Sequence, residues 1–221
     1  MTKMPQNALT CYLAADLNYS CTNESLPSII AGMEPDEKDI ILAICGSGDQ
    51  AFALLGSGAK VIAVDKDSRQ VEFARARLER LRRGDYDGFL SAPPAFNPCD
   101  PIARDIYFGR GNTLENIRAR LANVSFRRQD ITQLDDIVDK AYLSNVLDWI
   151  TDDKSVTDFL QRLASHIRQE GLVYLADKGA VKEHKILWNK EFEIDKRLTE
   201  RAVSLTYYGD THWIPIVLRK K

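Results

Sequence analysis

A glycine turn and a later carboxylate are the residues of this chain whose order could support chemistry on a ligand. The turn, Gly46-Ser47-Gly48, follows the apolar run 39–45, which is typical of a strand buried on both faces. Glycines let the backbone turn sharply and approach a ligand closely. Asp65 ends the next apolar run, 60–65. A carboxylate there can accept hydrogen bonds from both hydroxyls of a ribose, so this order predicts a site for a nucleoside-type ligand.

The turn departs from the dinucleotide-binding fingerprint, because Asp49-Gln50-Ala51 follows it and the third glycine is absent. Asp49, beside the start of the next helix, would repel a pyrophosphate that the helix dipole attracts. The Asp65 carboxylate would repel a 2′-phosphate, which disfavours NADP. S-adenosylmethionine (SAM) has no phosphate and carries an ammonium and a sulfonium, so it fits these charges better. We therefore expect SAM as the cofactor, with Asp49 near one of its cationic groups.

Two further polar residues follow expected strands. Asp130 comes after the strand 124–126 and is positioned to meet an adenine amino group, and Asn145 comes after the strand 140–143 and points into the same crevice. Each candidate also has a structural interpretation. Asp130 could start the next turn, Asp65 could cap the following helix, and the glycines could be plain turn residues. The order of strand, glycine turn, helix, strand and acid is more specific than any one of them.

The elements that must position these residues alternate between strand and helix. This alternation predicts a doubly wound α/β fold, with a mostly parallel sheet and helices on both faces. A helix is expected over about 181–197. After it, two strands joined by a turn at Gly209-Asp210 predict a C-terminal antiparallel pair. The expected strands are 39–45, 60–65, 124–126, 140–143, 171–176, 202–208 and 212–218, and the expected earlier helices are 50–55, 67–83, 112–121 and 152–168.

The length predicts one domain over residues 1–221, because a chain of this size can bury one core with a few additional elements. Residues 1–35 precede the sheet and are interpreted as an N-terminal lid. Residues 84–111 hold four of the eight prolines and are interpreted as an irregular insertion with short helical pieces. The arginines from Arg69 to Arg83 are interpreted as a solvated helix face rather than a phosphate-binding surface.

The composition is that of an ordinary globular protein. A formal net charge of −2 gives no global basic field, so it favours neither nucleic acid nor an anionic membrane as a partner. No apolar run approaches the roughly 20 residues that span a bilayer, and residues 1–13 show no secretory signal. The four cysteines form no CxxC pair, which favours reduced thiols and a cytoplasmic location. The three widely spaced histidines predict no metal site.

Three stretches of the chain resemble a known family of enzymes. They are YSCTNE (19–24), the glycine-turn region 41–90, and YLSNVLDWI (142–150). Together they resemble the class I SAM-dependent transferases and, more specifically, the 3-amino-3-carboxypropyltransferases that begin betaine-lipid synthesis by alkylating diacylglycerol. The resemblance covers about half of the chain, and YSCTNE and Gly48-Asp49 are its more specific parts. This chain is much shorter than those enzymes, so the resemblance implies the cofactor and the reaction type but not the lipid acceptor.

The reaction implied by the resemblance transfers the 3-amino-3-carboxypropyl group of SAM to a small-molecule acceptor and releases methylthioadenosine. Methyl transfer to a small molecule, which leaves S-adenosylhomocysteine (SAH), is the first alternative. A non-catalytic SAM-binding module is the second, and an NAD-dependent oxidoreductase is disfavoured by the missing third glycine. The carbon that faces the acceptor is a matter of geometry, which one sequence does not show. The sequence also leaves the oligomeric state open.

Residues at both ends of the chain complete the predicted site. Tyr19 and Glu24 are catalytic candidates within a lid over the methionine arm, with Glu24 as a base on the acceptor. Glu24 could instead be a first-turn carboxylate of the following helix. Acceptor-site candidates, for which edge packing is the alternative, are Tyr207, Tyr208 and His212. The expected cofactor contacts are Ser20, Asn23, Gly46, Ser47, Gly48, Asp49, Asp65, Lys66, Asp130, Ile131 and Asn145.

Overall fold

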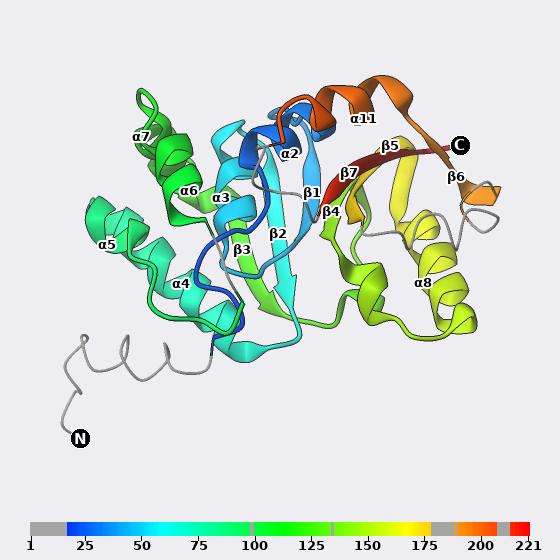
Figure 1. Cartoon of the computed structure of the whole chain (residues 1–221), viewed down its shortest axis with the longest axis horizontal. Coiled ribbons are helices and arrows are strands. Elements are labelled where there is room, and N and C mark those ends of the chain that lie inside the picture. The colour runs from blue at the N-terminus through cyan, green and yellow to red at the C-terminus, as the bar shows by residue number, and fades with distance from the viewer. Residues whose placement is uncertain (1–16, 98–99, 134, 178–187, 189, 207–212) are drawn as a thin grey trace.

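A seven-stranded sheet in the order β3-β2-β1-β4-β5-β7-β6 forms the centre of the computed structural model (Figure 1). The structure describes residues 17–97, 100–133, 135–177, 188, 190–206 and 213–221. The first five strands pair in parallel, whereas β7 is antiparallel to both β5 and β6. The predicted fold class, doubly wound and mostly parallel α/β, is confirmed. The strands are β1 (Ile40–Ile44), β2 (Lys60–Asp65), β3 (Val124–Arg128), β4 (Val138–Ser144), β5 (Ile167–Asp177), β6 (Phe192–Ile194) and β7 (Ile214–Lys220).

Helices cover both faces of the sheet because its central strands are apolar on both faces. Residues 41–43 of β1 and 61–64 of β2 are buried without interruption. One face packs against α2, α3, α4 and α11, and the other packs against α8. The helices are α2 (Leu26–Met33), α3 (Asp49–Gly56), α4 (Ser68–Arg83), α5 (Tyr86–Leu90), α6 (Pro101–Phe108), α7 (Thr113–Arg118), α8 (Asp153–His166) and α11 (Lys196–Val203).

The insertion over 84–111 contains the short helices α5 and α6. An aromatic cluster attaches it to the core, since the ring of Phe89 lies 5.1 Å from that of Phe52 in α3 and 5.3 Å from that of Phe108 in α6. Between the two helices the chain runs beside residues 17–22, near the lower edge of Figure 1. There the amide of Phe96 donates to the carbonyl of Leu17 at 2.8 Å. The insertion therefore supports the segment that precedes α2.

The C-terminal region differs from the sequence-based prediction. Residues 192–194 form β6, where the sequence predicts part of a helix over 181–197. Helix α11 occupies the start of the predicted strand 202–208, so β7 pairs with β5 and β6 instead. The acceptor-site candidates Tyr207, Tyr208 and His212 lie outside the described residues.

A local capping interaction explains why α11 forms. The carboxylate of Asp195 accepts a hydrogen bond from the amide of Leu198 at 2.9 Å, which satisfies one of the unpaired donors at the start of the helix. Leu198 and Ala202 then lie on one buried face, and that face packs against α2. Arg201 on the same helix pairs with Glu34 at the end of α2, with 2.5 Å between nitrogen and oxygen.

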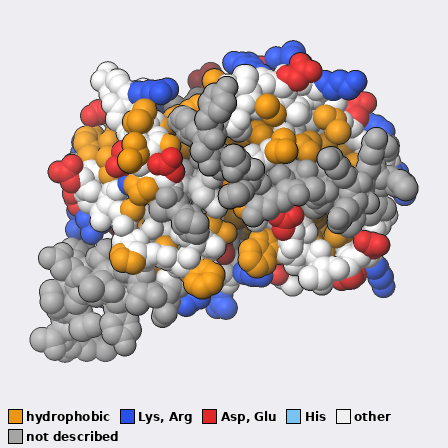
Figure 2. Space-filling view, viewed as in Figure 1, with side chains coloured by type: hydrophobic (Ala, Val, Ile, Leu, Met, Phe, Trp, Pro, Cys, Tyr) orange, Lys and Arg blue, Asp and Glu red, His pale blue; other side chains and the backbone are white. Residues whose placement is uncertain are grey.

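The face shown in Figure 2 has hydrophobic side chains interspersed with both acidic and basic ones. Among the helices of the described residues, none is both long enough and apolar enough to cross a membrane.

Leu198→Ala tests the packing of α11 on α2. Leu198 is fully buried, so its truncation should lower the free energy of unfolding by about 2–5 kcal/mol. Val203→Ala at the exposed end of the same helix should change it by at most about 0.5 kcal/mol. Urea denaturation measures both variants, and equal losses would contradict the observed packing.

Candidate functional site

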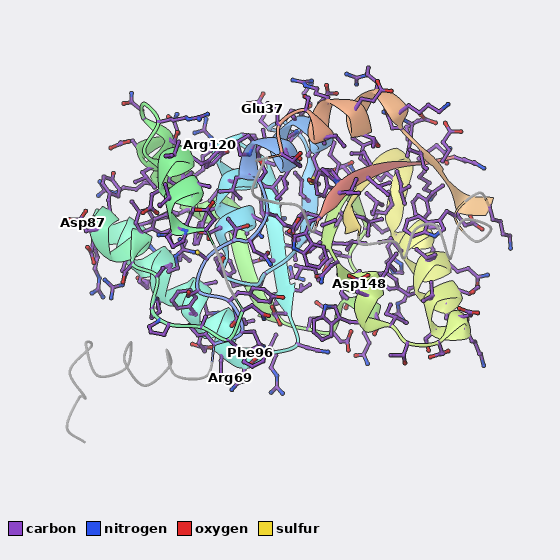
Figure 3. All side chains as sticks on the ribbon, in the orientation of Figure 1. Glu37, Arg69, Asp87, Phe96, Arg120 and Asp148 are labelled. Carbon is purple, nitrogen blue, oxygen red and sulfur yellow. The ribbon has the colours of Figure 1, made fainter. Side chains whose placement is uncertain are left out.

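The candidate site lies where the carboxyl ends of β1, β2 and β4 meet. The chain leaves β1 toward β2 on one side, whereas β4 pairs with β1 on the other side. This is the switch point at which open α/β sheets bind ligands. Figure 3 shows this edge of the molecule, with Arg69 of α4, Phe96 of the insertion and Asp148 near the end of β4 labelled.

The glycine turn occupies the centre of this edge, and its two glycines meet different requirements. Both adopt positive φ angles, 47° at Gly46 and 89° at Gly48, which side-chain-bearing residues rarely adopt. A Cβ atom added to Gly46 would meet nothing within 4 Å, whereas one at Gly48 would lie 3.1 Å from both Ala74 and Phe52. Gly46 therefore leaves the outer side of the turn open to a ligand, and Gly48 allows α3 and α4 to pack closely.

The carboxylate of Asp65 reaches from β2 to the glycine turn. One oxygen accepts from the amide of Gly46 at 3.1 Å, and the other accepts from the amide of Asp67 at 3.0 Å. Burial raises the pKa of Asp65, and these two hydrogen bonds oppose that shift. The N-cap of α4 is Asp67, which accepts from the amide of Arg69. The capping role considered for Asp65 thus belongs to Asp67, while Asp65 lies beside the turn as predicted.

The N-terminal segment, defined here as residues 17–25, brings Glu24 to the end of β4. One oxygen of Glu24 accepts from the hydroxyl of Tyr142 at 2.8 Å and from that of Ser144 at 2.5 Å. Ser144 has a φ of 52°, a costly angle for a residue with a side chain. Glu24 is not a first-turn carboxylate of α2, because Ser25 is the N-cap and the helix begins after it.

Tyr19 lies within electrostatic range of the carboxylates on both sides of the turn. Burial raises the pKa of its phenol, and the negative charges of Glu24 and Asp65 raise it further. The phenol therefore stays protonated at neutral pH. A protonated phenol can donate a hydrogen bond, and the catalytic role expected for Tyr19 stays a prediction.

Asp49 does not face a ligand. Its side chain is fully buried, and one oxygen pairs with Nη2 of Arg77 at 2.6 Å. The other oxygen accepts from the amide of Thr22 at 2.7 Å and from the hydroxyl of Ser47 at 3.0 Å. The expectation that Asp49 meets a cationic group of the cofactor is therefore corrected. The cation that Asp49 binds is the guanidinium of Arg77. The argument against a dinucleotide then rests on the missing third glycine.

The remaining predicted contacts are more dispersed. Asp130 accepts from the amide and hydroxyl of Thr132, at 2.9 and 2.8 Å, and so starts the short helix Ile131–Gln133 at the end of β3. Asn145 follows Ser144 and precedes the short helix Val146–Trp149. Ser20 and Ile131 are buried, Asn23 is half-buried, and Lys66 is exposed.

The comparisons with known proteins concern the fold. The sequence matches no protein-family model and no curated protein. The N-methyltransferase NodS from Bradyrhizobium japonicum WM9, crystallised with S-adenosyl-L-homocysteine, has a TM-score of 0.52 at 9% identity, over 87% of this chain and 83% of that one. The magnesium protoporphyrin IX methyltransferase ChlM from Synechocystis PCC 6803, crystallised with bound SAM, has a TM-score of 0.51 at 16% identity, over 97% and 77%.

TrmN from Thermus thermophilus gives a TM-score of 0.53 at 15% identity, over 89% of this chain and 48% of that one. This chain has the class I SAM-dependent methyltransferase fold. At such low identities the likeness does not extend to substrates.

Cys21, inside the N-terminal segment, is disulfide-bonded. Cys45, before the glycine turn, is a free buried thiol. The expectation of reduced thiols is thus wrong for Cys21. Because disulfides are rare in a reducing cytoplasm, the cysteines no longer support the expected cytoplasmic location, which stays a prediction.

Sequence reasoning missed several residues that build the site. Arg77 and Gln70 lie on the buried stripe of α4 with Ala74 and Leu81, so they are not part of a solvated face. Nη1 of Arg77 donates to the carbonyl of Ser47 at 2.8 Å, which fixes the glycine turn from behind. The available signal was the helical spacing of these polar residues with apolar ones. Tyr142 and Ser144, the partners of Glu24, gave no such signal.

Arg77→Met tests the buried pair behind the glycine turn. The side chains of Arg77 and Asp49 are 2% and 0% exposed, so removing the cation leaves an uncompensated buried carboxylate. The free energy of unfolding should fall by about 3–5 kcal/mol. Arg82→Met breaks an exposed pair on the same helix and should cost at most about 1 kcal/mol.

Chemical denaturation of Arg77→Met, Arg82→Met, Asp49→Asn and the double variant Asp49→Asn/Arg77→Met measures these losses. The double variant should lose less than the two single variants combined, because neither charge is then left alone. Additive losses, or a loss in Arg77→Met no larger than in Arg82→Met, would contradict the pairing.

Proposed function

We propose that this chain is a SAM-dependent transferase that moves the 3-amino-3-carboxypropyl group of SAM to a small acceptor and releases methylthioadenosine. The observation that carries the proposal is the contact between the open glycine turn and Asp65 at the switch point of the sheet. Such a turn admits a ligand at its outer side, and the adjacent carboxylate can accept hydrogen bonds from ribose hydroxyls.

The residues present fit the parts of SAM. Gly46 presents a side without a Cβ atom, and Asp65 offers its carboxylate for the ribose. Asp130, at the end of β3, lies on the β2 side of the turn, which suits the adenine. Glu24, bound to the end of β4, lies on the opposite side, where its negative charge suits the cationic amino-acid arm.

Bound SAM would supply an electrophilic carbon beside its sulfonium. The chain's own contribution is to align the acceptor, exclude water and remove a proton. Glu24 is the candidate for the last task because it brings a carboxylate to the end of β4, where two hydroxyl donors fix its position. The Tyr19 phenol, kept protonated, suits a donor that orients the acceptor or the carboxylate of the arm.

The family resemblance favours aminocarboxypropyl transfer, and its two more specific parts contact each other in the structure. Thr22 of YSCTNE donates its amide to Asp49, which follows the glycine turn, and its hydroxyl accepts from Nε2 of Gln50 at 3.0 Å. Methyl transfer is the second candidate, because the structures that share this fold are named as methyltransferases.

The nucleoside product distinguishes the two reactions. Purified protein is incubated with SAM and a small-molecule extract of its host, and the nucleosides are separated by chromatography against a no-protein control. Methylthioadenosine above the control is the expected result. SAH in its place would assign methyl transfer, and no product despite SAM binding would favour a non-catalytic module.

Asp65→Ala tests the ribose contact. Loss of hydrogen bonds to a charged acceptor should weaken SAM binding by about 1–3 kcal/mol, measured by calorimetry. Asp158→Ala, which removes an exposed carboxylate on α8, is the matched control and should bind as the wild type does. Unchanged affinity in a folded Asp65→Ala would remove the ribose assignment.

Glu24→Gln tests the base. The amide oxygen can still accept from Tyr142 and Ser144, so the site geometry should persist while proton removal is lost. The rate of nucleoside product formation should fall about 10²–10⁴-fold, with the free energy of unfolding little changed. Full activity in this variant would leave Glu24 with a structural role only.

A further inference from the structure

Gln70, in the first turn of α4, is a buried side chain between the glycine turn and the N-terminal segment. It is 1% exposed. Its Oε1 accepts from the amides of Asn18 at 2.9 Å and Tyr19 at 3.2 Å. Its Nε2 donates to the carbonyls of Tyr19 at 2.9 Å and Gly46 at 2.7 Å. One side chain thus binds two backbone stretches that no strand or helix joins.

The orientation of the Gln70 amide is fixed by its partners. Two backbone N–H groups require the oxygen on one side, and two carbonyls require the NH₂ group on the other. Both donors and both acceptor positions of a glutamine are then in use. A glutamate would direct an oxygen at two carbonyl oxygens, and an apolar residue would leave these partly buried backbone groups without this partner.

The two stretches joined by Gln70 carry groups from opposite sides of the candidate site. The carbonyl of Gly46 accepts a hydrogen bond from Gln70, and the amide of Gly46 donates one to Asp65. Gly46 therefore connects Gln70 to the carboxylate at the end of β2. Tyr19, held through both its amide and its carbonyl, carries the phenol whose pKa responds to Glu24 and Asp65. A shift of the turn is therefore transmitted to the segment that carries Tyr19 and Glu24.

We propose that Gln70 is a positioning residue that makes the glycine turn and the N-terminal segment respond to a ligand as one unit. A ligand that stabilises the turn then also stabilises residues 17–20, which Gln70 holds, whereas Thr22 has contacts of its own with Asp49 and Gln50. The inference that Gln70 joins the two stretches depends only on its hydrogen bonds. The choice of a SAM-type ligand as the probe rests on the proposed function.

Hydrogen exchange of the full chain, with and without SAH, tests this proposal. Gln70→Met keeps the length of the side chain and removes all four hydrogen bonds, and Gln161→Met on the exposed face of α8 is the matched control. In the wild type and the control, saturating SAH should slow exchange in both residues 17–20 and residues 44–50. In Gln70→Met, SAH at a newly saturating concentration should still protect residues 44–50 but no longer residues 17–20, with affinity reduced about 10–100-fold.

Gln70→Glu provides a second variant with a pH readout. Its ionised carboxylate should uncouple the two segments as Gln70→Met does, and protonation should partly restore joint protection, because a carboxylic acid regains one donor. A residue that only fills space would show no such recovery.

Joint protection of both segments in Gln70→Met, equal to that of the control, would overturn the proposal. If SAH does not bind the wild type, the proposed function fails, and the ligand-free samples still decide the role of Gln70. Faster exchange of residues 17–22 and 44–48 in ligand-free Gln70→Met than in Gln161→Met would support the joining role. Unchanged exchange would refute it.

Discussion

The buried ion pair of Asp49 and Arg77 connects three parts of the chain on which the candidate site depends. Asp49 receives the amide of Thr22 from the N-terminal segment, and Arg77 donates to the carbonyl of Ser47 in the glycine turn. Nε of Arg77 also donates to the carbonyl of Phe89, at the end of α5 in the insertion. None of these parts belongs to the sheet, so the pair supplies an attachment that strand pairing does not provide.

A buried pair of this kind adds little net stability, because removing two charges from water offsets most of their attraction. Its value lies in geometry. The guanidinium is planar and its donors point in fixed directions, so the carbonyls of Ser47 and Phe89 and the carboxylate of Asp49 must take set positions around it. The ring of Phe89, with its centroid 4.3 Å from the guanidinium carbon, completes this environment.

The parallel core and the glycine turn are predictable from the sequence because their signals are local. Apolar runs, glycines and a terminal acid follow one another, and parallel neighbours bring the acid to the turn. Local reasoning fails for Asp49, whose charge suggests a cationic ligand. Its counterion is Arg77, 28 positions away on a helix whose other charged residues suggest a solvated face. Gln70 is hidden for a similar reason.

Other features of the site have no local signal at all. Nothing in a serine indicates the positive φ of Ser144, and Asp195 caps a helix in a region whose composition also suits a strand. The partners of Glu24 are apparent only when the order of strands around β1 is known. The contacts of side chains whose partners are distant in sequence can be predicted only once the order of the strands is known.

The contacts of Glu24 also determine when the site can form during folding. Its partners Tyr142 and Ser144 are 118 and 120 positions further along the chain, so both contacts close very long loops. On the ribosome, the glycine turn and β2 emerge well before β4. The hydroxyl partners of Glu24 are therefore absent until the end of β4 has been synthesised. Because contacts that close such long loops are slow to form, the contacts of Glu24 cannot be made before β4 has been synthesised. A nascent chain that stops short of β4 would contain Glu24 without the two hydroxyl groups that hold its carboxylate.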